Sequence, residues 1–128
     1  MKIFKLALAG LMLAAAISPA SEVPTPEHVK WMKDLGAQMG AIRKGADVQK
    51  NAQDMQATLK LVGAFWKARN SEVAMKSCGE SFKGAKAVAE AGDNKEAVMA
   101  GMKMIGAGCK GCHDAHREKI SDTENRFK

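Results

Sequence analysis

Two cysteines and a histidine near the C-terminus have the spacing that could hold a cofactor. Cys109 and Cys112 are three residues apart, and His113 follows directly. On a helix, thiols at positions i and i+3 share a face and can form thioether bonds to two vinyl groups, while the next imidazole can bind iron. Cys-x-x-Cys-His is the attachment signal of haem c. The sequence therefore predicts one covalent haem c, held by Cys109 and Cys112 with His113 as the proximal iron ligand.

Two other chemistries use similar residues. A redox-active Cys-x-x-Cys pair lies where a strand leads into a helix, but residues 94–108 carry apolar side chains at helical spacing. The motif is therefore expected inside a long helix. A zinc site would have four ligands, Cys109, Cys112, His113 and His116. Four ligands so close together on one helix do not easily surround a metal tetrahedrally, so haem is favoured.

Four segments of the chain have apolar residues at helical spacing, and none reads as a convincing strand. Each segment follows a residue that can cap a helix, namely Thr25, Asp47, Ser71 and either Asp93 or Asn94. The first ends near Lys44-Gly45, the third is closed by Gly92, and the last carries the haem motif on an apolar face that continues to Ile120. We expect an all-α fold, an antiparallel four-helix bundle with the haem near the C-terminal end of the last helix.

The first twenty residues have the features of a secretory signal. Lys2 and Lys5 precede an apolar run from Leu6 to Ile17, and small residues follow at Ser18-Pro19-Ala20. The run is about twelve residues long, shorter than the roughly 20 that span a membrane, and a retained anchor is the alternative. Cleavage after Ala20 predicts a periplasmic protein with one domain, residues 21–128, and no membrane span.

A helical bundle with Cys-x-x-Cys-His near its C-terminus resembles the class II cytochromes c, which comprise cytochrome c prime and its low-spin, methionine-ligated relatives. The resemblance covers residues 21–128, and the haem motif is its specific part. It implies a distal residue on the first helix. The segment Met39-Gly40-Ala41-Ile42 is similar to a segment of the family, and this match puts Met32 at the distal position. Arg117 matches a basic residue four after His113 and is an expected haem contact.

Two positions differ from the family pattern. His28 stands where the family usually has arginine, and His116 stands where it usually has an aromatic residue. His28 is expected to be exposed in the first helical turn, with a role as second axial ligand as the alternative. One turn separates His28 from Met32, so both cannot bind one iron. His116 is expected near the haem edge, and Trp66 is the tryptophan better suited to contact the haem.

Met32 separates two functions. If its thioether binds iron, the haem is six-coordinate and low-spin, and the protein transfers electrons. If Met32 only shields the site, the iron is five-coordinate and open to nitric oxide or carbon monoxide. Electron transfer is favoured because the pocket must present some side chain to the iron. No paired carboxylates, nucleophile–base pair or phosphate loop indicates an enzyme.

Charge and cysteine count bear on partners. Loss of Lys2 and Lys5 lowers the net charge from +6 to +4, and two ionised haem propionates lower it to about +2. The lysines are scattered and lack interleaved aromatics, which argues against nucleic acid as a partner. A mildly basic surface favours docking to acidic patches on redox partner proteins. Cys78 is expected as a buried small residue, with a disulfide across a homodimer as the alternative.

Overall fold

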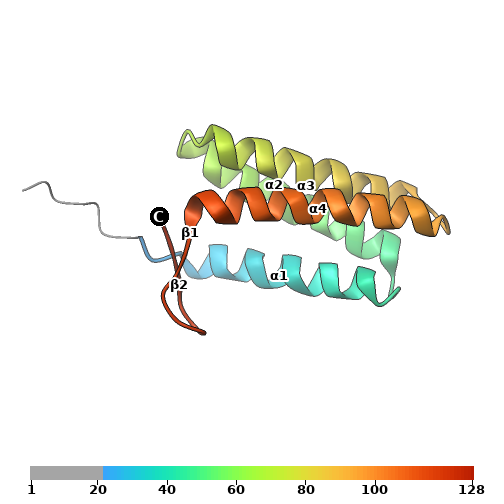
Figure 1. Cartoon of the computed structure of the whole chain (residues 1–128), viewed down its shortest axis with the longest axis horizontal. Coiled ribbons are helices and arrows are strands. Elements are labelled where there is room, and N and C mark those ends of the chain that lie inside the picture. The colour runs from blue at the N-terminus through green and yellow to red at the C-terminus, as the bar shows by residue number, and fades with distance from the viewer. Residues whose placement is uncertain (1–21) are drawn as a thin grey trace, which may run out of the picture.

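The computed structural model describes residues 22–128, which are mostly helical with little sheet (Figure 1). Its helices are α1 (Pro26–Arg43), α2 (Val48–Ala68), α3 (Glu72–Glu90) and α4 (Lys95–His116), and its strands are β1 (Arg117–Lys119) and β2 (Asn125–Phe127). Four helices were predicted, and this part of the prediction is confirmed. The predicted signal, residues 1–20, lies outside the described residues. None of the described helices is both long and apolar enough to cross a membrane.

Three helices begin with the side-chain cap that the sequence predicts. In each, an oxygen of the cap residue accepts a hydrogen bond from a backbone N–H three residues later, at 3.1–3.2 Å. This bond satisfies one of the backbone donors that the first turn of a helix leaves unpaired. The cap residues are Thr25 for α1, Ser71 for α3 and Asn94 for α4.

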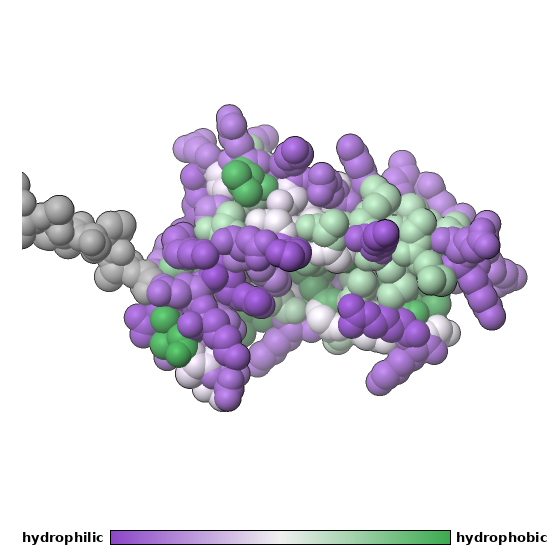
Figure 2. All heavy atoms as spheres, viewed as in Figure 1, coloured by the Kyte–Doolittle hydropathy of each residue, from purple (hydrophilic) through white to green (hydrophobic). Residues whose placement is uncertain are grey.

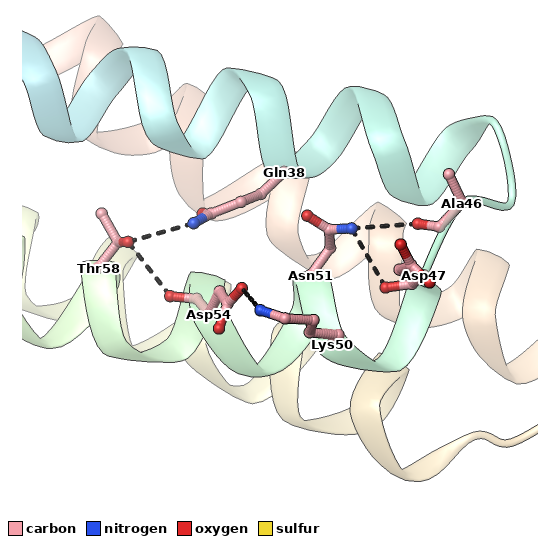
Figure 3. A network of polar contacts seen from close by, with 7 residues as sticks. All are labelled: Gln38, Ala46, Asp47, Lys50, Asn51, Asp54 and Thr58. Atoms are coloured by element: carbon pink, nitrogen blue, oxygen red, sulfur yellow. Dashed lines mark hydrogen bonds and ion pairs between the residues drawn. The ribbon is translucent and has the colours of Figure 1, made fainter.

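The start of α2 differs from the prediction. Asp47 does precede the helix, but its backbone is left-handed, with φ of 42°, and its side chain makes no capping bond. The Asn51 side chain instead donates to the backbone carbonyls of Ala46 and Asp47, at 3.1 and 3.2 Å (Figure 3). Gln38 Nε2 of α1 donates to Oγ1 of Thr58, which lies further along α2, at 3.5 Å. This bond links the two helices.

The hydrophobic core forms where successive helices pack, α1 on α2, α2 on α3 and α3 on α4. Its central cluster is buried to at least 96% and is contributed by all four helices. Apolar side chains at helical spacing explain this, because each helix turns one face towards its neighbours. The cluster comprises Ile42, Ala52, Met55, Leu59, Ala85, Val88 and Ile105.

Two glycines beside the cysteines let α4 approach α3 closely. A Cβ added to Gly111 would lie 2.7 Å from Ser77 Oγ, and one added to Gly108 would overlap the Ser81 hydroxyl. Ser81 Oγ also donates to the carbonyl of Ile105 at 2.9 Å, a buried bond between the two helices. The segment that carries Cys109, Cys112 and His113 is therefore held directly against α3.

We expect Gly108→Ala to destabilise the protein, because the new methyl group would lie 2.8 Å from the Ser81 backbone nitrogen and overlap the Ser77 carbonyl. Overpacking of this kind costs about 1–3 kcal/mol, measurable by denaturant unfolding. Gly79→Ala is the control, since an added Cβ there meets no atom within 4 Å. Alanine in place of an exposed helical glycine should stabilise by about 0.5–1 kcal/mol. Equal effects of both changes would contradict the close packing.

The C-terminal segment differs from the sequence prediction. The apolar face of the last helix was expected to continue to Ile120, but α4 ends at His116 and Ile120 is exposed. Strands β1 and β2 pair antiparallel as a hairpin, with Arg117 opposite Phe127. Ser121 Oγ accepts hydrogen bonds from the backbone N–H groups that follow it, which stabilises the turn. Burial of Phe127, which is 8% exposed, favours this hairpin over a longer helix.

Candidate functional site

A cavity of about 770 Å³ lies beside the C-terminal half of α4. Pockets for cofactors and small molecules usually have volumes of about 300–1,000 Å³. All six site residues proposed from the sequence line this cavity, and they come from α1, α2, α4 and β1. They are Met32, Trp66, Cys109, Cys112, His113 and Arg117. Folding thus brings together residues that the sequence separates widely.

The two thiols of the motif lie half-buried on the cavity wall and form no disulfide. Both belong to α4, so their spacing of three residues places them on one face of that helix. Burial raises the pKa of the Cys112 thiol to about 11, with a smaller contribution from Cys109. Ser81 Oγ lies 3.8 Å from Cys109 Sγ. At neutral pH the Cys112 side chain is therefore a thiol and not a thiolate.

His113 follows the second cysteine and is also half-buried. Burial lowers the pKa of its imidazole, the nearby Arg117 guanidinium lowers it further, and the Asp114 carboxylate opposes both. Asp114 itself lies on the exposed side of the helix, where it pairs with Lys110 at 2.5 Å. The neutral imidazole, which is the form that binds a metal ion, is thus favoured at neutral pH.

Met32 of α1 contributes a thioether to the cavity. Its side chain is half-buried, and Leu35 and Met39 line the cavity further along the same helix. Neighbouring apolar residues of α2 and α4, Val62 and Ile105, add to the wall. A thioether sulfur and an imidazole nitrogen thus line one mainly apolar cavity.

His28 was predicted to be exposed, and this prediction is wrong, because the side chain is 5% exposed. Its ring lies 4.7 Å from the Phe65 ring and 4.8 Å from the Phe127 ring, measured between centroids. Burial, and then the charges of Arg69 and His113, lower the pKa of His28 to about 4. His28 lines the cavity, and its Nδ1 atom has no hydrogen-bond partner. The sequence did not indicate this burial, because the covering residue comes from the C-terminal hairpin.

His116 ties the end of α4 to two other helices. Its ring stacks on the Trp66 indole, with centroids 4.1 Å apart and planes 20° apart. Its Nε2 atom lies 2.6 Å from the hydroxyl of Ser71, the residue that caps α3. Both rings line the cavity, and Trp66 is 5% exposed. This clamp restrains the last helical turn, directly after His113.

Cys78 of α3 is buried, as the sequence predicts, and it lines the same cavity. Burial raises the pKa of its thiol to about 12, with smaller contributions from Cys112 and Cys109. A buried sulfur is not presented to a second chain, which argues against the alternative of a disulfide across a homodimer. Cys78 is best described as a wall residue of the cavity.

The sequence did not predict that the C-terminal hairpin forms part of the site. Residues 123–127 line the cavity, and so do Val23 and Pro24 near the other end of the described chain. The available signal was Ser121-Asp122, a pair of turn-forming residues directly after Ile120. Such a pair predicts a turn, but it does not predict where the returning strand will pack.

Within residues 22–128, no three or more His, Cys, Asp or Glu side chains are grouped so that they could hold a metal ion. The zinc alternative, with Cys109, Cys112, His113 and His116 as ligands, therefore finds no support. Comparison of the chain with family models, with curated proteins and with solved structures finds no match. The cavity and its donor groups are the basis for a functional proposal.

Proposed function

We propose that this protein is a periplasmic c-type cytochrome that carries one haem and transfers electrons, as its resemblance to the class II cytochromes c implies. One observation carries the proposal. Cys109, Cys112 and His113, in the order and spacing of haem c attachment, line a single cavity together with Met32. Export by residues 1–20 belongs to the proposal, and so does an antiparallel order of the helices. Connections of three or four residues between successive helices favour that order.

The cavity suits a haem in volume and in chemistry. Its volume, about 770 Å³, is within the usual range for a cofactor. The buried imidazole of His28 leaves Nδ1 unpaired, which is the kind of unsatisfied polar atom that a native fold normally gives a partner. When bound, a haem supplies an iron that accepts and releases one electron as it changes between the ferric and ferrous states.

Residues of this chain would hold, orient and shield such a group. The thiols of Cys109 and Cys112 would supply two covalent bonds from one face of α4. His113 would present a neutral imidazole nitrogen, and the stack of His116 on Trp66 restrains the helical turn behind it. Met32 would present a soft thioether, which raises the reduction potential of the iron it binds. The apolar wall would exclude water.

The charged residues that line the cavity favour an acidic redox partner. Four of them are basic, namely Lys33, Arg43, Arg117 and Arg126. The acidic residue among them, Glu124, is paired with Arg126 at 2.7 Å. A basic opening attracts an acidic patch on another protein and speeds transient docking. Redox partner proteins are therefore the proposed partners, and nucleic acid is not.

The direct test is the mass and spectrum of the mature protein made in a host that matures c-type cytochromes. We expect an intact mass that exceeds the polypeptide 21–128 by one haem. We also expect the pyridine haemochrome spectrum of a haem joined by two thioether bonds, because both thiols line the cavity. A mass equal to that of the bare polypeptide would contradict the proposed function.

A further inference from the structure

We infer that the C-terminal hairpin covers the cavity and decides the size of the molecules that reach the iron. The hairpin is β1, β2 and the turn between them, residues 117–127. This inference rests on the proposed function, because the iron is what the cover protects. Figure 1 shows the hairpin passing from the end of α4 across the start of α1. These are the two helices that carry His113 and Met32.

Most of the returning half of the hairpin belongs to the cavity wall. Residues 123–127 line the cavity, and Arg117 at the start of β1 lines it too. The other side of the hairpin faces water. Glu118 and Lys119 of β1 are exposed and do not line the cavity, and hydrophilic side chains dominate the surface of this end of the molecule in Figure 2. The hairpin therefore separates the cavity from solvent, and its contribution to the core is Phe127, which joins a buried cluster with Val62, Trp66, Ala74 and Cys78.

Phe127 fastens the hairpin to the bundle. It is 8% exposed, and its ring lies 4.8 Å from the ring of His28, 5.3 Å from Trp66 and 5.6 Å from Phe65, between centroids. The His28 and Trp66 rings meet it at 86° and 69°, the edge-to-face arrangement that aromatic pairs favour. Phe127 is the one buried residue of the two strands, and burial of its ring stabilises the hairpin against the bundle.

Polar contacts also hold the end of the hairpin, at Phe127 and the adjacent Lys128, against the bundle. The Phe127 backbone N–H donates to the carbonyl of Glu22 at 2.8 Å, and the Glu22 carboxylate makes two bonds to the Arg69 guanidinium, at 2.6 and 2.7 Å. That guanidinium lies 4.2 Å from the centroid of Phe65 and 5.5 Å from that of Phe127. The N–H of Lys128 also donates to the His116 carbonyl at 2.9 Å. The end of α2, residue 22 and the hairpin are thereby joined.

The cover should be removable without unfolding the bundle. A two-stranded hairpin is marginally stable by itself in water, and Phe127 is the buried residue of this one. The ion pairs on the hairpin, Lys119 with Asp122 and Arg126 with Glu124, are largely exposed and contribute little. Phe127→Ala should therefore release the hairpin, while the central core cluster, which does not include Phe127, stays packed.

The test compares ligands of two sizes on ferrous holoprotein that carries Met32→Ala, which removes the proposed distal ligand and opens the sixth position. Carbon monoxide is the small probe and n-butyl isocyanide is the large one. Adding Phe127→Ala should raise the association rate of the isocyanide about tenfold. A hydrophobic site discriminates about 10- to 200-fold between molecules that differ by one methylene, and we expect the lower end of that range. The carbon monoxide rate should change much less, because a small diatomic ligand needs little clearance.

Two further variants make the result interpretable. Ile120→Ala is the matched control, since Ile120 is a 46% exposed residue of the hairpin that does not line the cavity. It should leave both rates unchanged. Deletion of residues 120–128 removes the turn and β2, which supply residues 123–127 of the cavity wall, and should raise the isocyanide rate at least as much as Phe127→Ala. Helical circular dichroism equal to that of the parent supports release of the hairpin alone.

The outcomes separate the cover from the proposed function. If the parent carries haem and both variants change the two association rates by the same factor, or change neither, the cover is overturned and the cytochrome proposal stands. A parent without covalent haem overturns the cytochrome proposal and the cover with it. An isocyanide-selective increase in Phe127→Ala and in the deletion, but not in Ile120→Ala, supports the cover.

Discussion

Replacement of both Cys109 and Cys112 by alanine is expected to give a protein that keeps no haem after extraction with acidified acetone. The two thioether bonds are the covalent links in the proposed site, and the His113 nitrogen binds only through the iron, so acid releases the haem once both sulfurs are gone. The pyridine haemochrome assay and intact mass measure the loss. Unchanged protein should keep its full complement of one haem under the same extraction.

Cys78→Ala is the matched control for this experiment. Cys78 is buried and lines the same cavity, but it lies on α3 and outside the motif. The variant should keep one covalent haem per chain. Retained haem in the double variant would contradict attachment through the motif, and loss of haem in Cys78→Ala would show that the third thiol takes part.

Met32→Ala is expected to have the second largest effect, because it removes the proposed distal ligand. The unchanged ferric protein should be low-spin, with the weak near-infrared band of sulfur-to-iron ligation. The variant should lose that band, show a lower reduction potential and bind carbon monoxide in the ferrous state. The reason is that a neutral thioether stabilises ferrous iron, and its removal leaves a position open. Absorption spectra and redox titration measure these changes.

Met39→Ala controls for loss of packing on the same helix. Met39 is half-buried and lines the cavity, as Met32 does. Truncation of a fully buried methionine to alanine costs about 2–5 kcal/mol, so this half-buried residue should cost less and leave the spectrum unchanged. A similar spectral change in both variants would show that general loosening of the cavity, and not loss of a ligand, is responsible.

Two other results would change the functional proposal. A high-spin ferric spectrum and carbon monoxide binding in the unchanged protein would identify a five-coordinate, gas-binding cytochrome in which Met32 only shields the site. If His28→Ala, and not Met32→Ala, makes the iron accessible to carbon monoxide, His28 is identified as the ligand. The structure makes that second outcome physically accessible, because His28 is buried and lines the cavity.

Features that depend on neighbours in the sequence could be predicted from the sequence. The caps of α1, α3 and α4 form as expected because a cap bond spans only three residues. The spacing of Cys109, Cys112 and His113 places them on one stretch of helix for the same reason, since helical geometry relates residues three and four apart. The cap at Asp47 did not form because a capping residue has an extended backbone, whereas the backbone of Asp47 is left-handed.

Features that depend on distant residues were decided only by tertiary structure. Periodicity assigned His28 to a helix, but it could not show that Phe127 and Phe65 would cover that position. The apolar pattern that continues to Ile120 matched a helix, yet burial of Phe127 against the bundle favours a hairpin. The sequence by itself therefore determined the helices and the order of the donor groups. Packing between elements decided which side chains share the cavity and what covers it, because burial arises from contacts that no local pattern records.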